Sequence, residues 1–185
     1  MLFSATNILA VALALANYVS AAPVDLEERG SKVIIGYRTM QKHGTVVWYT
    51  AGGVQLGDAV YLTPGPGQWK APESYWHCVI YADQTKFLAA KKAWIPEYNG
   101  HTKLWFEPKE IDSYLKTTRH ETPDETLRLA AMDGDTSVLQ MGIPKHMLGK
   151  TGELDLEAYC KEKASELPQH VVNYKTLNNA VGTAQ

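Results

Sequence analysis

The sequence predicts an α+β domain whose core is made mostly of strands. Short apolar runs rich in β-branched and aromatic residues fill the middle of the chain, stretches with helix-start signals gather in the second half, and proline or glycine breaks separate them. Because strands dominate the middle of a chain that also contains helices, α+β is the class we expect. The 185 residues are enough for one domain with a sizeable core, and nothing requires a second.

The first 22 residues form a unit of their own. They carry no charged side chain and close in small residues, which is the pattern of a signal peptide. Their apolar core at 8–16 is shorter than the roughly 20 residues that a membrane span needs. We therefore expect a secreted, extracellular protein with no membrane association after cleavage, although an uncleaved amphipathic anchor is the alternative. After the signal peptide (1–22), we expect a polar leader at 23–31, one domain at 32–170 and a C-terminal tail at 171–185.

The first half of the domain is expected to consist of strands. The apolar, β-branched run "KVIIGYR" predicts a strand over 32–38 that ends in Arg38, so a guanidinium stands where a buried strand stops. Three further runs predict strands: "TVVWYT" (45–50), "AVYLT" (59–63) and "YWHCVIYA" (75–82). The "PGPG" stretch at 64–67 stops the third of these four strands, because its prolines and glycines disfavour both a ladder and a helix.

Helices are expected mainly after residue 83. Asp83 is an N-cap residue for a helix over 84–94, which Pro96 ends. A proline and an acidic residue in the first turn predict a second helix over 108–118. The other expected elements are a strand at 103–107, a helix or strand at 124–132, a strand at 137–143 before Pro144, and a helix at 153–167 closed by Pro168.

Charge and common site motifs exclude several classes of function. The formal net charge is −2 and the basic residues are dispersed, so no surface for nucleic acid is expected. The sequence contains no G-x-S-x-G, H-E-x-x-H, C-x-x-C or G-x-x-x-x-G-K-[ST] motif. The six histidines include no helical i, i+4 pair, so no metal site is expected either.

The two cysteines, Cys78 and Cys160, predict one disulfide, because a secreted chain meets an oxidising compartment. A catalytic thiol at Cys78 with His77 as its base is a poor alternative. Neighbouring residues on a strand point to opposite faces, so these two side chains would not meet.

Four motifs in order carry a family resemblance: "GYRT", "QLGDAVYLTPGPGQW", "SYWHCVIYAD" and "LQMGIPKHM". In this order the chain resembles secreted mono-ADP-ribosyltransferases, which include the enzymatic chain of heat-labile-enterotoxin-type toxins and related fungal secreted proteins. The resemblance runs from about residue 33 to 148. It implies an ADP-ribosyltransferase-like fold, with a β-rich core of two packed small sheets and flanking helices, and it implies NAD as the substrate.

The resemblance assigns four residues to NAD binding. Arg38 matches the strand-end arginine that anchors NAD, since a guanidinium bonds phosphate or ribose oxygens in a fork and stays charged. Tyr61 would stack on the nicotinamide, and Thr63, on the same strand face, would hydrogen-bond nearby. Trp69 would offer a stacking surface to the dinucleotide. The alternatives are a structural ion pair for Arg38 and a core position for Tyr61.

The catalytic position departs from the family pattern. The family's glutamate begins a strand segment of three further residues and a proline, and the matching residue here is Gln140. An amide supplies no full negative charge to the oxocarbenium-like centre that forms when the bond between nicotinamide and ribose breaks. A different register moves the site upstream to Asp133, Asp135 or Ser137, with Asp135 presenting the carboxylate. Gln140 and Asp135 are therefore both candidates.

Three functions follow from these expectations. The first is a secreted toxin or effector that binds NAD and either transfers ADP-ribose to a target or hydrolyses NAD. The second is the same fold without catalysis, which binds a host partner. The third is an unrelated small secreted hydrolase or binding domain whose motif order is coincidental. The host, the target protein and the acceptor group are left open by the sequence.

Overall fold

The structure is a computed structural model that describes residues 31–41, 55–148 and 152–184. Its strands are β1 (Lys32–Gln41), β2 (Ala59–Leu62), β3 (Tyr75–Asp83), β4 (Lys91–Trp94), β5 (Tyr98–Asn99), β6 (Thr102–Lys103), β7 (Thr126–Met132), β8 (Asp135–Pro144), β9 (Glu157–Lys161) and β10 (Ala180–Val181). Its helices are α1 (Gln84–Ala89), α2 (Pro108–Tyr114) with the π-helical turn η1 (Leu115–Arg119), and the 3-10 turns η2 (Pro123–Glu125), η3 (Lys145–Met147), η4 (Ala164–Glu166) and η5 (Tyr174–Thr176).

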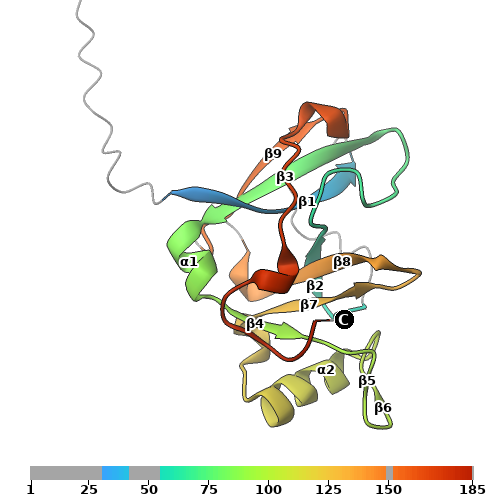
Figure 1. Ribbon diagram of the computed structural model, residues 1–185, viewed down its shortest axis with the longest axis vertical. Helices are drawn as coiled ribbons and strands as arrows, with labels where there is room; N and C mark the ends of the chain where they lie inside the picture. Colours follow the sequence, from blue (N-terminus) through green and yellow to red (C-terminus); the bar gives the residue numbers. More distant parts are fainter. Residues whose placement is uncertain (1–30, 42–54, 149–151, 185) are drawn as a thin grey trace, which may run out of the picture.

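Two sheets make the core of the molecule (Figure 1). Sheet A is antiparallel and has the strand order β1-β3-β9. Sheet B is mixed and has the order β10-β4-β7-β8-β2, while β5 and β6 form a separate hairpin. In Figure 1, sheet A lies above sheet B, and α2 lies below sheet B. The molecule is therefore α+β with a β-rich core of small sheets and few helices, as the sequence predicts.

The apolar side chains divide into three clusters. The largest lies between the sheets, with Ile80 of sheet A and Met141 of sheet B both fully buried in it. The second lies between sheet B and α2, and the third covers the outer face of sheet A around Val79. Each strand of the sheets presents alternate residues to alternate faces, so one strand feeds two clusters.

The two sheets are joined by backbone hydrogen bonds at one corner. The N–H of Tyr37 in β1 donates to the carbonyl of Thr63 at 2.9 Å, and the N–H of Thr63 donates back at 2.8 Å. Thr63 directly follows β2, so the chain leaves sheet B and touches sheet A at this residue. We call this pair of residues the corner bridge.

The start of the first predicted helix is confirmed, and its length is wrong. The Asp83 carboxylate accepts the N–H of Lys86 at 2.8 Å, as an N-cap should. The helix ends at Ala89, and residues 91–94 form β4 inside sheet B. Lys92 is only 1% exposed, and its ammonium donates to the carbonyls of Phe87 at 2.7 Å and Ala90 at 2.8 Å. A lysine that caps α1 in this way can occupy a core strand.

Two other predicted elements are wrong. The strand expected at 103–107 is reduced to the last residue of β6, and the chain turns at 105–106. The helix expected at 153–167 is replaced by β9 and η4. Its apolar residues recur every second position from Leu154 to Cys160, which is the period of a strand and not of a helix.

The remaining expectations have mixed outcomes. The strands expected at 32–38, 59–63, 75–82 and 137–143 and the helix at 108–118 are confirmed with shifted ends, and 124–132 becomes η2 followed by β7. The run at 45–50 lies outside the described residues. The disulfide between Cys78 and Cys160 is present. Within the described ranges, no helix is both long and apolar enough to cross a membrane.

The C-terminal residues 171–184 pack into the domain. Tyr174 is 1% exposed and donates its hydroxyl to the carbonyl of Ile35 in β1 at 2.9 Å. A side chain on Gly36 would collide with this hydroxyl, so the close approach depends on glycine. Farther on, β10 extends sheet B by pairing in parallel with β4.

Candidate functional site

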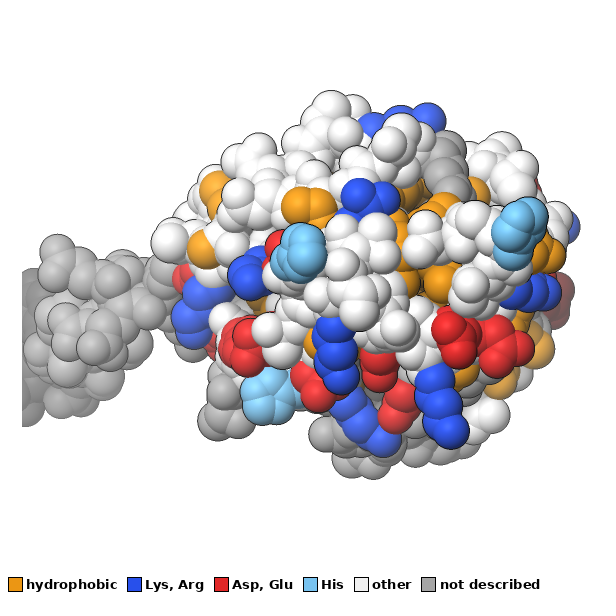
Figure 2. Space-filling model, turned by 90° about the horizontal axis from the view of Figure 1, so that it is seen from below, with side chains coloured by type: hydrophobic (Ala, Val, Ile, Leu, Met, Phe, Trp, Pro, Cys, Tyr) orange, Lys and Arg blue, Asp and Glu red, His pale blue; other side chains and the backbone are white. Residues whose placement is uncertain are grey.

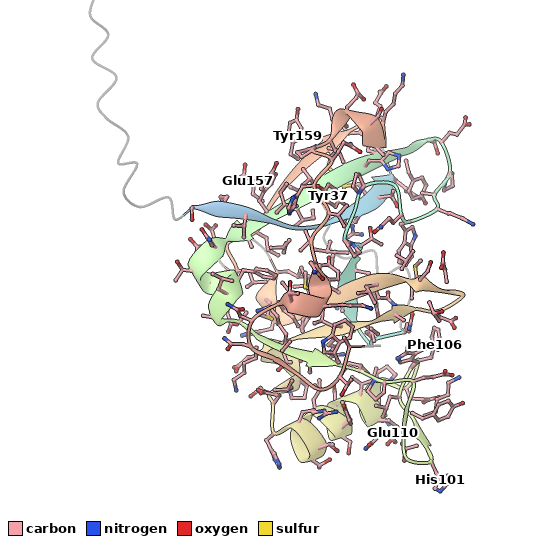
Figure 3. All side chains as sticks on the ribbon, viewed as in Figure 1. Tyr37, His101, Phe106, Glu110, Glu157 and Tyr159 are labelled. Atoms are coloured by element: carbon pink, nitrogen blue, oxygen red, sulfur yellow. A yellow bond between two sulfur atoms is a disulfide. The ribbon has the colours of Figure 1, made fainter. Side chains whose placement is uncertain are left out.

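A small hollow lies beside the corner bridge, where β1 and β3 face the loop that follows β2. Its volume is about 180 Å³, counting space that opens to solvent. The residues that line it are Tyr37, Arg38, Thr39, Thr63, Pro66, Gly67, Trp69, His77, Cys78 and Leu167. Three of the four residues expected to bind NAD therefore line the same hollow. Figure 3 labels Tyr37, which marks its position on sheet A.

Arg38 is the one cation of this lining that stays charged at any pH, and it has no partner among the residues that the structure describes. Its Nε atom is buried without a hydrogen-bond partner. Within the described ranges no carboxylate or carbonyl bonds any other atom of its guanidinium, so the ion pair considered as an alternative is absent. Burial lowers the pKa of Arg38, and no nearby charge opposes that effect. A half-buried guanidinium without a partner retains its capacity to bind an anion.

The loop after β2 closes one side of the hollow. Thr63 is 1% exposed, and its hydroxyl is shared between the carbonyls of Gly65 at 3.1 Å and Tyr37 at 3.3 Å. The N–H of Gly65 donates to the side chain of Gln68 at 2.8 Å, which holds the following turn. Trp69 then lies half-buried against the cluster between sheet B and α2. The loop thus brings an aromatic ring to the hollow, while the Thr63 hydroxyl is already engaged.

The other wall comes from β3 and the chain after η4. His77 lines the hollow, and its Nδ1 atom is buried without a hydrogen-bond partner in the described part of the chain. The hydroxyl of Tyr37 donates to the carbonyl of Pro168 or of His170, each at 2.8 Å, and so holds that segment beside Leu167. The sequence pointed to His77 only as a base for Cys78. The disulfide removes that role and leaves an unpaired imidazole nitrogen at the hollow.

Tyr61 lies away from the hollow, although it is on β2, the strand that leads directly to Thr63. It is 7% exposed and belongs to the cluster between sheet B and α2. Its hydroxyl accepts the N–H of Leu56 at 2.8 Å and donates to the carbonyl of Gly57 at 2.8 Å. Burial raises its pKa to about 12. In this position Tyr61 is a core aromatic with a satisfied hydroxyl, and it does not line the hollow.

Gln140 is also separate from the hollow. It is 1% exposed, and its amide donates to the side-chain oxygen of Gln55 and to the carbonyl of Ala131 at 3.4 Å. Gln55 in turn donates to the Ala131 carbonyl at 2.9 Å and accepts the N–H of Asp133 at 2.8 Å. This buried amide network holds the β7–β8 hairpin to the chain that precedes β2. Both amide groups are used within it.

Asp135, the other catalytic candidate, is exposed at the start of β8. Its carboxylate accepts the N–H of Ser137 at 3.2 Å and the hydroxyl of Ser137 at 2.5 Å, which is a local turn contact. Neither Asp135 nor any other carboxylate is among the residues that line the hollow. The hollow therefore combines a cation, an imidazole and aromatic surface without an acidic group.

Two further features of the described residues bear on the chemistry of the site. No group of three or more histidine, cysteine, aspartate or glutamate residues in the described part of the chain has a metal-binding arrangement. Figure 2 views the molecule from below, where α2 and the β5–β6 hairpin lie, and shows acidic and basic side chains interspersed on that face. The chemistry available at the hollow is therefore anion binding with aromatic contact.

Comparisons with known proteins give one family match. A family described as a family of unknown function (DUF5910) matches residues 54–183. No curated protein and no solved structure matches the chain. The matched range includes β2, the loop that closes the hollow, and His77, whereas Arg38 lies before it.

Proposed function

Because the chain belongs to DUF5910, a family of unknown function, we propose its activity from the hollow itself: the protein binds NAD there, as the secreted mono-ADP-ribosyltransferases that it resembles do. The observation that carries this proposal is the unpaired guanidinium of Arg38, whose Nε is buried beside the hollow. Desolvating a cation without a partner costs free energy, and an anionic ligand recovers it. A pyrophosphate or ribose supplies oxygens that suit a guanidinium fork.

The other residues of the hollow suit the remaining parts of a dinucleotide. Trp69 offers a ring for stacking, and the buried Nδ1 of His77 lacks a partner. The hollow is shallow and encloses no space the size of a water molecule, whereas small-molecule pockets typically enclose roughly 300 to 1,000 Å³. NAD would therefore lie over the hollow, with one polar portion against Arg38 and the rest along the loop that carries Trp69, and the side chains of the lining would have to move apart for any portion to enter.

The α+β architecture with its β-rich core of small sheets supports one part of the proposal, the fold that the motif order implies. Two small sheets pack face to face around an apolar cluster and have helices at their margins. This arrangement supports an ADP-ribosyltransferase-like fold as part of the proposal. The disulfide between Cys78 and Cys160 supports secretion in the same way, since such bonds persist in oxidising compartments.

Turnover would cleave the bond between nicotinamide and ribose and pass the ribosyl carbon to a target side chain or to water, with release of nicotinamide and a proton. A negative charge near the ribose would stabilise the transition state. The described lining contains no carboxylate, and the Gln140 amide is committed to Gln55 and Ala131. This favours the second candidate, an inactive protein of the same fold that binds a host partner.

The test is a thermal shift with NAD and with ADP-ribose, beside an assay for free nicotinamide. A ligand at 100 times its dissociation constant should add about 2.7 kcal/mol to the free energy of unfolding. We expect Arg38→Ala to abolish the shift and Arg38→Lys to weaken it, because lysine keeps the charge and loses the fork. Lys70→Ala is the matched control, since Lys70 is exposed next to Trp69 and does not line the hollow.

The outcomes separate the candidate functions. Nicotinamide release that Arg38→Ala removes would establish an active enzyme. A shift with NAD and no release above blank would leave the inactive binder. If neither NAD nor ADP-ribose shifts the transition, or if Arg38→Ala leaves the shift unchanged, the proposal of an NAD site at this hollow is wrong.

A further inference from the structure

We propose that the outer edge of β9 is a self-association surface, to which a second copy of this chain adds its own β9 in the antiparallel direction. The inference rests on sheet A and is independent of NAD binding. Sheet A has the order β1-β3-β9, so β9 is an edge strand. Across residues 31–41, 55–148 and 152–184, no strand pairs with its outer side. An edge strand presents unpaired backbone donors and acceptors to any strand that fits them.

The geometry of the disulfide identifies which backbone groups face the open edge. Cys78 and Cys160 lie directly opposite each other, with their Cα atoms 4.0 Å apart. In antiparallel sheets, pairs that exchange hydrogen bonds are about 5.5 Å apart and the others about 4.5 Å apart. Cys160 is therefore not bonded to β3 through its backbone, and its N–H and C=O point outward. The two-residue alternation of a strand gives Ala158 the same orientation.

One register of self-pairing satisfies these groups. When two β9 strands run antiparallel with Tyr159 opposite its counterpart, Ala158 of each copy lies opposite Cys160 of the other. These are the residues whose backbone groups face outward, so they can exchange both hydrogen bonds. A shift by one residue would set inward-facing groups against outward-facing ones.

The same register pairs opposite charges. Glu157 and Lys161 lie two residues before and after Tyr159, so all three side chains share one face of β9. In the dimer, Glu157 of each copy lies opposite Lys161 of the other, which gives two complementary pairs. Opposite charges at facing positions stabilise a strand pair, and like charges destabilise it. Figure 3 shows Glu157 and Tyr159 at the outer margin of sheet A.

β9 lacks two of the features that protect an edge from pairing, a bulge and a proline. Proteins also protect edges with short strands and with charged side chains, lysine above all. β9 is short and carries Glu157 and Lys161, but in this register the two charges attract their counterparts. β9 pairs with β3 without a register shift, contains no proline, and has at its centre Tyr159, which is 47% exposed. The disulfide already holds β9 in its extended form, so little conformational entropy remains to be lost. The contact is short, and we expect a weak dimer.

The test is sedimentation equilibrium of the full protein with its disulfide intact, from about 1 µM to about 1 mM. We expect a concentration-dependent dimer. Glu157→Lys and Lys161→Glu should each weaken it about tenfold or more, because each variant sets like charges opposite each other twice. An equimolar mixture of the two variants should recover association, since every mixed pair again joins a lysine to a glutamate.

Matched controls make the same charge changes on α2. The control variants are Glu110→Lys and Lys109→Glu. Both residues are exposed on α2, and Figure 3 shows Glu110 at the opposite end of the molecule from Tyr159. These controls should leave association unchanged. The inference is overturned if the protein stays monomeric over the whole range, if the single charge reversals have no effect, or if mixing them does not restore the dimer. None of these results depends on NAD, so the two proposals fail separately.

Discussion

Arg128 and Arg38 lie in two regions that treat a buried guanidinium in opposite ways. Arg128, on β7 in sheet B, is 4% exposed and donates to the carbonyl of Leu56 at 2.6 Å and to the carboxylate of Asp112 at 3.2 Å. The Nε of each arginine is buried without a partner among the described residues, but Arg38, on β1 in sheet A, also has no partner there for its two terminal nitrogens. Burial lowers the pKa of both, but Asp112 partly offsets the effect at Arg128 alone.

The comparison separates a structural arginine from a binding one. A cation whose terminal nitrogens are bonded inside the fold, as those of Arg128 are, contributes to stability and is costly to remove. A cation that is desolvated without a partner contributes little to the fold and keeps its donors for a ligand. The region around Arg128 is therefore part of the core, and we propose the region around Arg38 as a binding site.

The largest expected effect concerns the link that holds the Arg38 region in shape. Cys78 lies opposite Arg38 in the β1–β3 pair and is bridged to Cys160 across 82 residues of sequence. Replacing both cysteines by serine should lower the free energy of unfolding by about 4 kcal/mol, because the unfolded chain loses a long closed loop. Urea unfolding measures this, and reduced wild-type protein is the control. A loss below about 1 kcal/mol would mean that the fold around the hollow does not need the bond.

The next effect tests the two arginines directly. Arg128→Met should cost about 3 kcal/mol, since it leaves a carboxylate and buried carbonyls without their donor. Arg38→Met should change the free energy of unfolding by less than about 1 kcal/mol in either direction, because it breaks no bond within the described fold. Both are read from urea midpoints at a constant m-value. Equal losses in the two variants would erase the distinction between the regions.

A smaller effect is expected for Gln140→Glu, which restores the acid of the related family. In the structure it would place a carboxylate where two acceptors, on Gln55 and Ala131, require a donor. Stability at pH 7 should fall by about 2 kcal/mol. Burial would raise the folded pKa of this carboxyl, so stability should recover as the pH falls toward 4 and the group regains a proton.

Gln140→Leu is the control for that variant, because its loss should not depend on pH. Nicotinamide release should stay at the level of the wild-type protein in Gln140→Glu. A gain in release would show that residue 140 reaches the ribose, and it would move the site from the Arg38 hollow toward sheet B.

The smallest effect concerns Lys92, a buried cation whose ammonium donates to two carbonyls and has no acidic partner within residues 31–41, 55–148 and 152–184. Burial lowers its pKa from 10.5 to about 8. Between these values the unfolded chain holds a proton that the folded chain has released, so stability should rise as the pH increases from 8 to 10.5. Over the first unit of that range, from pH 8 to pH 9, Lys92→Met should remove a rise of about 1 kcal/mol. An identical pH profile in both proteins would contradict the assignment.

The sequence predicts the elements that have one clear local signal. β1, β3 and β8 are apolar runs, and α1 begins where Asp83 supplies an N-cap. The sequence analysis missed β4 and β9 because helix-forming residues in both segments favour a helix locally, whereas contacts with distant parts of the chain favour a strand. A lysine such as Lys92 is typical of a helix surface, and it can be buried in β4 only because the carbonyls of Phe87 and Ala90 accept its ammonium. The β9 segment is rich in helix formers, although its apolar residues alternate as in a strand.

Contacts between distant segments also explain why only three of the four residues expected to bind NAD line the hollow. Alternation along a strand places Tyr61 and Thr63 on one face, and it predicts that both reach one pocket. β2 ends at Leu62, and Thr63 turns toward Tyr37 to make the corner bridge. Tyr61 therefore stays in the core while Thr63 reaches the hollow. A change of direction between two sheets depends on distant partners, and no single segment encodes it.

The C-terminal segment described above acts as a strap, because Tyr174 bonds to β1 and β10 pairs with β4. The stretch from Tyr174 to Val181 is thus attached to both sheets, and it packs against the apolar cluster that lies between them. Cutting the chain before residue 171 would remove one of the links between the two sheets and leave the corner bridge and the apolar cluster to hold them together. Tags and deletions at this end therefore belong among the perturbations of the core.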